Sequence, residues 1–166
     1  FVRYSQAPAL ITAAYRLIWT VLIMTPAVLA NKKVIGEIKN MKGRALLLCA
    51  ASGIFLAFHF SLWFESLNLT SVASSTAIVC TEVIWVALGY CIFMKGQLVT
   101  KAKISIAMTV AGSIVIAMAD GSAGGNSLYG DLLALLSALF STVYTLIGKQ
   151  VRKNLSTTAY TFIVYF

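Results

Sequence analysis

Long apolar runs alternate with short polar connectors along the chain. Five of these runs could cross a membrane, because a spanning helix needs about 20 mostly apolar residues. They lie at 9–30, 45–64, 71–94, 104–119 and 132–148. The first residues resemble the end of an earlier span, and residues 157–166 resemble the start of a later one. The pattern predicts an all-α polytopic transmembrane bundle, and we expect the chain to be a segment truncated at both ends.

The connectors are short, so consecutive helices are expected to be antiparallel neighbours. Connector 30–44 holds five Lys or Arg residues, and connectors 95–103 and 149–156 hold three each, which makes eleven of the thirteen. Connectors 66–70 and 120–127 hold none. Because Lys and Arg accumulate on the cytoplasmic side of membrane proteins, we predict that the three basic connectors are cytoplasmic. The polar part of 30–44 could form either a surface helix or a loop.

The composition supports a membrane protein. Hydrophobic residues make up 60% of the chain and charged residues 11%, whereas a soluble domain carries roughly 25% charged residues. A net charge of +8 would indicate nucleic acid in a soluble protein, but here the cations fill the gaps between apolar runs, so we expect no nucleic-acid partner. Cys49, Cys80 and Cys91 lie inside apolar runs without CxxC spacing. We interpret them as packing residues and expect neither a metal site nor a cofactor.

A weak internal repeat appears when the chain is offset by 145 residues. LITAAYRLI, from Leu10 to Ile18, then aligns with LSTTAYTFI, from Leu155 to Ile163, and five of nine positions are identical. The copies are five spans apart, and an odd number of spans inverts the second copy in the membrane. Inverted repeats are typical of secondary transporters, although five matches could also arise by chance in an apolar chain.

Four stretches carry a resemblance to a known family. They are APALITAAYRLIWTVLIMTP, GIFLAFHFSLWFESLNLTSVASSTAIV, GQLVTKAKISIAMTVAGSIVIA and LYGDLLALLSALFSTVYTL. In this order they resemble the second helix, the third and fourth helices, the basic turn with the fifth helix, and the opening of the second repeat in the EamA-like branch of the drug/metabolite transporter superfamily.

This resemblance implies a ten-helix transporter built from two inverted five-helix repeats. Residues 1–120 would be the first repeat with helix one truncated, 121–127 an outer loop, and 128–166 the truncated start of the second repeat. Members often carry an acidic residue after the glycine of the four–five turn, where this chain has Gln97. They often carry a proline in mid helix four, about where this chain has Glu82, which would bring an ionisable group into the translocation path.

Glu82 is the clearest candidate for a functional residue. It lies near the middle of an apolar run, where a charge costs on the order of 2.5–3.5 kcal/mol and therefore faces a cavity or a partner. Ser75 precedes it and Trp85 follows it at helical spacing, so the three share a stripe. Glu82 could bind a substrate amine or a proton, or it could form a structural ion pair with Arg16.

Arg16 and His59 are also candidates. Arg16 could bind a substrate carboxylate or extend toward the membrane interface, and Tyr15 lies beside it. His59 could relay protons, or it could hydrogen-bond between helices. We expect Glu82 and Arg16 to face a central cavity, with His59 and Trp85 on its wall.

Small and hydroxylated residues indicate close helix contacts or a polar cavity lining. One such line has 3–4 spacing and comprises Ser137, Ser141, Tyr144 and Gly148. Tyr144 is the member of this line that we take as a site candidate. We further expect close packing at small residues of helices two to five: Gly53, Ser74, Ala77, Ala111 and Gly112.

These observations predict a secondary carrier of small polar organic metabolites, such as amino acids, that works by alternating access in a bacterial cytoplasmic membrane. A proton gradient or exchange would drive it, and its partners would be the substrate and the lipid bilayer. A membrane-embedded enzyme is disfavoured, because the chain has one His and no HExxH or DxxD motif. A non-transporting membrane subunit and a multidrug exporter are the alternatives.

Overall fold

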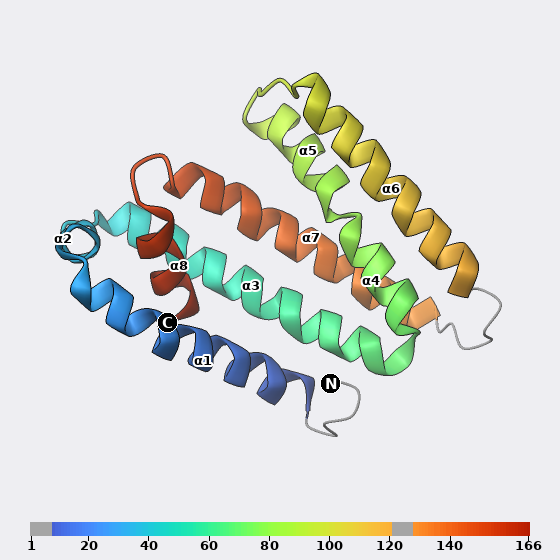
Figure 1. Ribbon diagram of the computed structural model, residues 1–166, viewed down its shortest axis with the longest axis horizontal. Helices are drawn as coiled ribbons and strands as arrows, with labels where there is room; N and C mark the ends of the chain where they lie inside the picture. Colours follow the sequence, from blue (N-terminus) through green and yellow to red (C-terminus); the bar gives the residue numbers. More distant parts are fainter. Residues whose placement is uncertain (1–7, 121–127) are drawn as a thin grey trace.

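The structure, a computed structural model, describes residues 8–120 and 128–166. Within them every regular element is an α-helix (Figure 1). The helices are α1 (Ala9–Ala30), α2 (Lys32–Lys39), α3 (Gly43–Leu69), α4 (Val72–Cys80), α5 (Glu82–Phe93), α6 (Thr100–Asp120), α7 (Leu128–Val151) and α8 (Thr157–Tyr165). The connector that could have been a helix or a loop therefore contains a helix, α2.

Four helical stretches of the described chain are long and apolar enough to cross a membrane. They are Ile11–Ala30, Gly43–Leu69, Val72–Phe93 and Leu128–Val151, which matches four of the five predicted spans. The fifth predicted span, 104–119, is helical within α6 but is not among the four. Residues 104–119 hold no Asp, Glu, Lys or Arg, and this stretch remains a predicted span.

The most extensive helix–helix interface in the described bundle is between α3 and α7, which lie side by side. Figure 1 shows α7 between α3 on one side and α4 and α5 on the other. Consecutive helices are therefore not always neighbours as we expected: α6 packs against α4 rather than against α7. Small residues on α7 explain its position between these helices. Ala134, Ser137 and Ala138 are fully buried, and their short side chains let α7 pack closely against its neighbours.

The predicted small-residue contacts are confirmed in part. Ser74 and Ala77 are buried, and a Cβ at Gly53 would lie 3.0 Å from the carbonyl oxygen of Val164, although this contact is with α8 rather than within helices two to five. The prediction is wrong for Ala111 and Gly112, which are exposed. No described atom lies within 4 Å of a Cβ built at Gly112.

The two ends of the bundle differ in charge. Helix α2, the α5–α6 turn and the α7–α8 turn lie at one end, and these segments belong to the three basic connectors (Figure 1). The α3–α4 turn and the start of α7 lie at the other end. There the Thr70 hydroxyl donates a 2.8 Å hydrogen bond to Asp131 Oδ1. The three basic connectors thus lie at one end of the described bundle, and their cytoplasmic placement stays a prediction.

Candidate functional site

Glu82 lies at a break in the helical run Val72–Phe93. The run is interrupted at Thr81, whose hydroxyl donates a 2.6 Å hydrogen bond to the carbonyl oxygen of Ile78. Threonine hydroxyls that bond back in this way compete with the helical ladder and bend it. Glu82 is the first residue of α5, where the amide groups at a helix start favour a negative charge.

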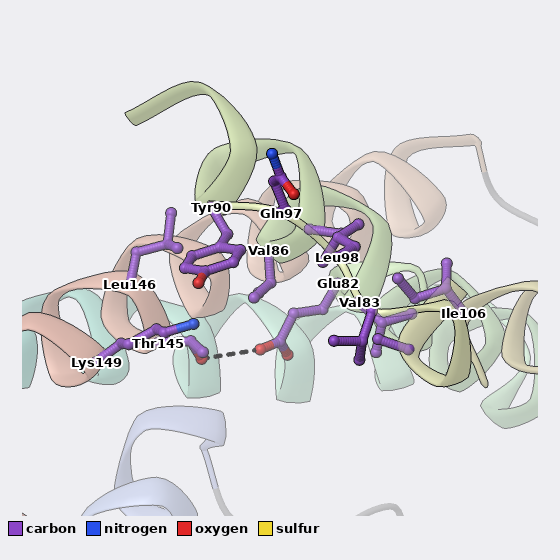
Figure 2. Close-up of a pocket in the computed structure, with 13 residues that line it drawn as sticks. Glu82, Val83, Val86, Tyr90, Gln97, Leu98, Ile106, Thr145, Leu146 and Lys149 are labelled. Carbon is purple, nitrogen blue, oxygen red and sulfur yellow. Dashed lines mark hydrogen bonds between the residues drawn. The ribbon is translucent and has the colours of Figure 1, made fainter. Parts of the chain in front are cut away.

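The Glu82 side chain lines a cavity of about 510 Å³ between α5, α6 and α7. Most of the wall is aliphatic and includes Val83, Val86, Leu98, Ile106 and Leu146 (Figure 2). Its charged groups are the carboxylate of Glu82 and the ammonium group of Lys149, and Tyr90, Gln97 and Thr145 add polar atoms. The cavity can therefore hold a small molecule that has both an apolar part and a charged or polar group.

Two contacts organise the polar groups of this cavity. The Thr145 hydroxyl donates a 3.1 Å hydrogen bond to Glu82 Oε1. Lys149, one turn further along α7, places its Nζ 3.3 Å from the centroid of the Tyr90 ring. Figure 2 shows this ammonium group turned into the cavity beneath the ring, on the side where Thr145 and Glu82 meet.

The α5–α6 turn fixes the Tyr90 ring. The Gly96 amide donates to the carbonyl oxygen of Tyr90 over 3.2 Å, and a Cβ at Gly96 would lie only 2.1 Å from the Tyr90 Cζ. Lys95, just before it, has a φ of 48°, in the left-handed region. A glycine at position 96 thus lets the turn close directly over the ring.

Arg16 and Tyr15 do not reach this cavity. Both side chains are exposed on α1, and the Arg16 guanidinium carbon lies 4.9 Å from the centroid of the Phe60 ring on α3. The structure therefore does not bring Arg16 to Glu82, and the ion pair that the sequence left open is not formed.

His59 connects α3 to α7. The side chain is 6% exposed, and its Nδ1 lies 3.0 Å from the carbonyl oxygen of Ser137 and 2.8 Å from the Ser137 hydroxyl. That hydroxyl donates in turn to the carbonyl oxygen of His59 over 3.0 Å. This geometry is the interhelical bonding that was one of the two interpretations of His59.

The remaining candidates also lie outside the cavity. Ser75 is fully buried and shares a 2.5 Å hydrogen bond with Ser66 on α3. Tyr144 packs its ring 6.2 Å from that of Tyr160, and the buried Nε1 of Trp85 has no hydrogen-bond partner among the described residues. Glu82 is thus the one predicted site residue in this cavity, and the roles of the others remain predictions.

Sequence reasoning missed Thr145, Lys149 and Tyr90. Tyr90 lies eight residues after Glu82, about two turns along one helix face, and this spacing is visible in the sequence. Lys149 was counted only as a topology charge because it ends an apolar run. In the described chain, no three His, Cys, Asp or Glu side chains lie close enough together to hold a metal ion.

Comparison with known proteins gives one family. Residues 2–118 match the EamA-like transporter family, which is a family of membrane transporters and not of enzymes. No curated protein and no solved structure matches the chain. The family match covers well over half of the 166 residues and agrees with the apolar helices described above. The chain therefore belongs to the EamA-like transporter family.

Proposed function

We propose that this chain is part of a secondary carrier that moves small polar organic metabolites, such as amino acids, across a membrane by alternating access. Membership of a transporter family supports this function, and the cavity at Glu82 gives it a site. A proton gradient or exchange of substrates would supply the energy. The basic end of the bundle would face the cytoplasm of a bacterial cell.

The observation that carries the proposal is the Glu82 carboxylate in a cavity whose wall is mostly aliphatic. A charge inside a membrane is costly unless it is compensated. The Thr145 hydroxyl donates one hydrogen bond to this carboxylate, while the Lys149 ammonium of the same cavity lies against the Tyr90 ring. A substrate amine or a proton would therefore be stabilised at Glu82, and its uptake and release would accompany the change of access.

We also propose a ten-helix architecture of two inverted five-helix repeats. The two copies of the internal repeat lie in α1 and α8, which contact each other. A pair of equivalent helices that meet near the centre of the assembly would suit a transporter whose halves move against each other.

Transport into proteoliposomes tests the function. The full-length protein would be reconstituted and supplied with a panel of labelled amino acids and related metabolites, with and without a proton gradient. If Glu82 couples protons, Glu82→Gln should abolish gradient-driven uptake but leave exchange partly intact. If Glu82 binds a substrate amine, Glu82→Gln should weaken binding and exchange together.

Glu65→Gln is the matched control, because Glu65 is exposed on α3, away from the cavity, and should transport normally. Uptake by Glu82→Gln with unchanged affinity and pH dependence would rule out both roles of Glu82. Absence of transport for every compound would contradict the proposed function.

A multidrug exporter is the second candidate. The aliphatic walls around one carboxylate would also suit a lipophilic cation, which needs apolar contact and a countercharge. Adding tetraphenylphosphonium to the transport panel separates the two candidates, since a metabolite carrier should transport amino acids in preference to it.

A further inference from the structure

A second cavity, of about 570 Å³, lies at the basic end of the bundle. Its wall comes from α2, the α2–α3 turn, the start of α3, the end of α7 and the α7–α8 turn. No residue lines both this cavity and the Glu82 cavity. The proposed carrier function therefore assigns it no role.

Two cations line this second cavity. Lys42 is the last residue of the α2–α3 turn, and Arg44 is the second residue of α3. Neither side chain has a hydrogen bond, an ion pair or a ring contact within the described part of the chain. The start of α3 has no side-chain cap, and the amides at a helix start add partial positive charge. An anion beside Lys42 and Arg44 would thus be stabilised.

Glu37 supplies a carboxylate to the same wall, but this group is already engaged. It accepts a 2.9 Å hydrogen bond from the Ser156 amide, and the positive charge of Lys33 acts on it favourably. Glu37 therefore leaves the two cations of the cavity uncompensated. Three amide side chains that can donate hydrogen bonds to a ligand complete the polar wall: Asn40, Gln150 and Asn154.

The remainder of the wall is apolar and continues toward the membrane-spanning part of α3. Met41, Ala45 and Leu48 line the cavity. Leu47 lies three residues after Arg44, so the two share a helix face. It is 70% exposed and belongs to a stretch that is long and apolar enough to cross a membrane. A ligand with its anion at Arg44 would find an apolar surface directly beneath it.

We propose that this cavity binds the phosphodiester headgroup of an anionic phospholipid. Lys42 and Arg44 hold the phosphate, the amide side chains bind the headgroup hydroxyls, and the acyl chains follow the exposed face of α3 past Leu47. Basic side chains bind phosphate through charge-assisted hydrogen bonds, and basic pockets between membrane helices suit lipid headgroups. A soluble phosphodiester shares the charge but would leave the apolar face of α3 uncovered.

Binding of phosphatidylglycerol to the purified full-length protein in a nonionic detergent tests this proposal. Native mass spectrometry would count the lipids that each protein retains. The unmodified protein should retain one phosphatidylglycerol more tightly than phosphatidylcholine, whose quaternary ammonium cancels the charge of its phosphodiester. Combining Lys42→Gln with Arg44→Gln should weaken phosphatidylglycerol binding about tenfold, because both cations near the anionic headgroup are lost.

Lys101→Gln combined with Lys103→Gln is the matched control. These two exposed lysines also lie two residues apart at a helix start, that of α6, but do not line the cavity. The control removes the same net charge and should retain phosphatidylglycerol nearly as the unmodified protein does. Asn154→Trp leaves the charge unchanged but adds bulk to the cavity wall, and it should also weaken binding. Asn154 is exposed in the α7–α8 turn, so this change should leave the bundle intact.

Equal binding by the two charge-matched double variants would overturn the proposal, because overall charge would then explain the affinity. Undiminished binding by Asn154→Trp would place the lipid outside the cavity. Equal displacement of phosphatidylglycerol by glycerophosphoglycerol, the same headgroup without acyl chains, would identify a soluble ligand instead of a lipid. These results do not depend on transport, so the lipid site and the carrier function can fail separately.

Discussion

Gly130, near the start of α7, lies against the turn between α3 and α4. A Cβ at this position would lie 2.9 Å from the Thr70 nitrogen and 3.0 Å from the Leu69 carbonyl carbon. These are backbone atoms of a tight turn, which cannot rotate aside as a flexible side chain can. Glycine at this position thus permits a close approach of α7 to the α3–α4 turn.

Gly130→Ala should therefore destabilise the bundle, because α7 or the turn must move. We expect the free energy of unfolding to fall by about 1–3 kcal/mol, as for other overpacked contacts. The measurement is the midpoint of unfolding in detergent. Gly112→Ala is the control: no atom lies within 4 Å of its Cβ position, and alanine favours the helix by about 1 kcal/mol. A Gly130→Ala protein as stable as the control would contradict this contact.

Individual residues also show what a sequence can predict. Glu82 was identified as a candidate because a carboxylate in an apolar run is costly wherever the helix faces, whereas the helix break at Thr81 was not predicted. Lys149 was missed because its contact with Tyr90 joins positions 59 residues apart, and no periodicity within one helix reports such a pair. The direction of Arg16 was likewise open, since a helix that is apolar on all sides does not show which side packs.

At the scale of elements, α2 and α8 are joined outside the membrane-spanning helices. Glu37 on α2 accepts a 2.9 Å hydrogen bond from the Ser156 amide at the start of α8. The Ser156 side chain caps the same helix by accepting from the Ala159 amide over 3.3 Å. Hydrogen bonding from Ser156 lowers the pKa of Glu37, and the charge of Lys33 lowers it further.

This link should depend on pH. Because the pKa of Glu37 is lower in the folded protein than its ordinary value of about 4.3, its stabilising effect is complete above that value. The effect is lost as the pH falls through the lower, folded pKa. Hydrogen exchange at the Ser156 amide, corrected for its intrinsic pH dependence, should accelerate in this acidic range.

Glu37→Gln should remove that acidic step, because an amide does not titrate there. Glu65→Gln provides the control, since Glu65 is exposed on α3 and not in α2 or α8. The assignment would be wrong if the acidic step remained in Glu37→Gln or disappeared in Glu65→Gln.

The helices themselves were largely predictable, and their neighbours were not. Apolar run length located α1, α3, the α4–α5 run and α7, because membrane thickness sets the length of a span. The placement of α7 between α3 and α5 depends on the fit of small residues across helices. That fit involves partners distant in sequence. An apolar side chain also gains little free energy by packing against a helix instead of against lipid, so its hydrophobicity does not indicate which helix it contacts.

At the scale of the whole molecule, the distribution of charge is the strongest prediction from sequence. Successive connectors alternate between several Lys or Arg residues and none. In the structure the basic connectors lie at one end of the bundle (Figure 1). The cavity opens between α5, α6 and α7 with Tyr90 and Lys149 toward this same end. If the basic end is cytoplasmic, Lys149 would meet a substrate arriving from the cytoplasm before Glu82 does.

Cysteine labelling of the full-length protein would establish this orientation. Single cysteines would be introduced at Lys33, Gln97, Lys153 and Asn68, all exposed positions, after Cys49, Cys80 and Cys91 are replaced by alanine. Lys and Arg resist translocation, so a membrane-impermeant maleimide should reach the first three positions only in opened cells or inverted vesicles. It should reach position 68 in intact cells. Labelling of position 97 from outside would break the alternation and place the Lys149 end of the cavity on the external side.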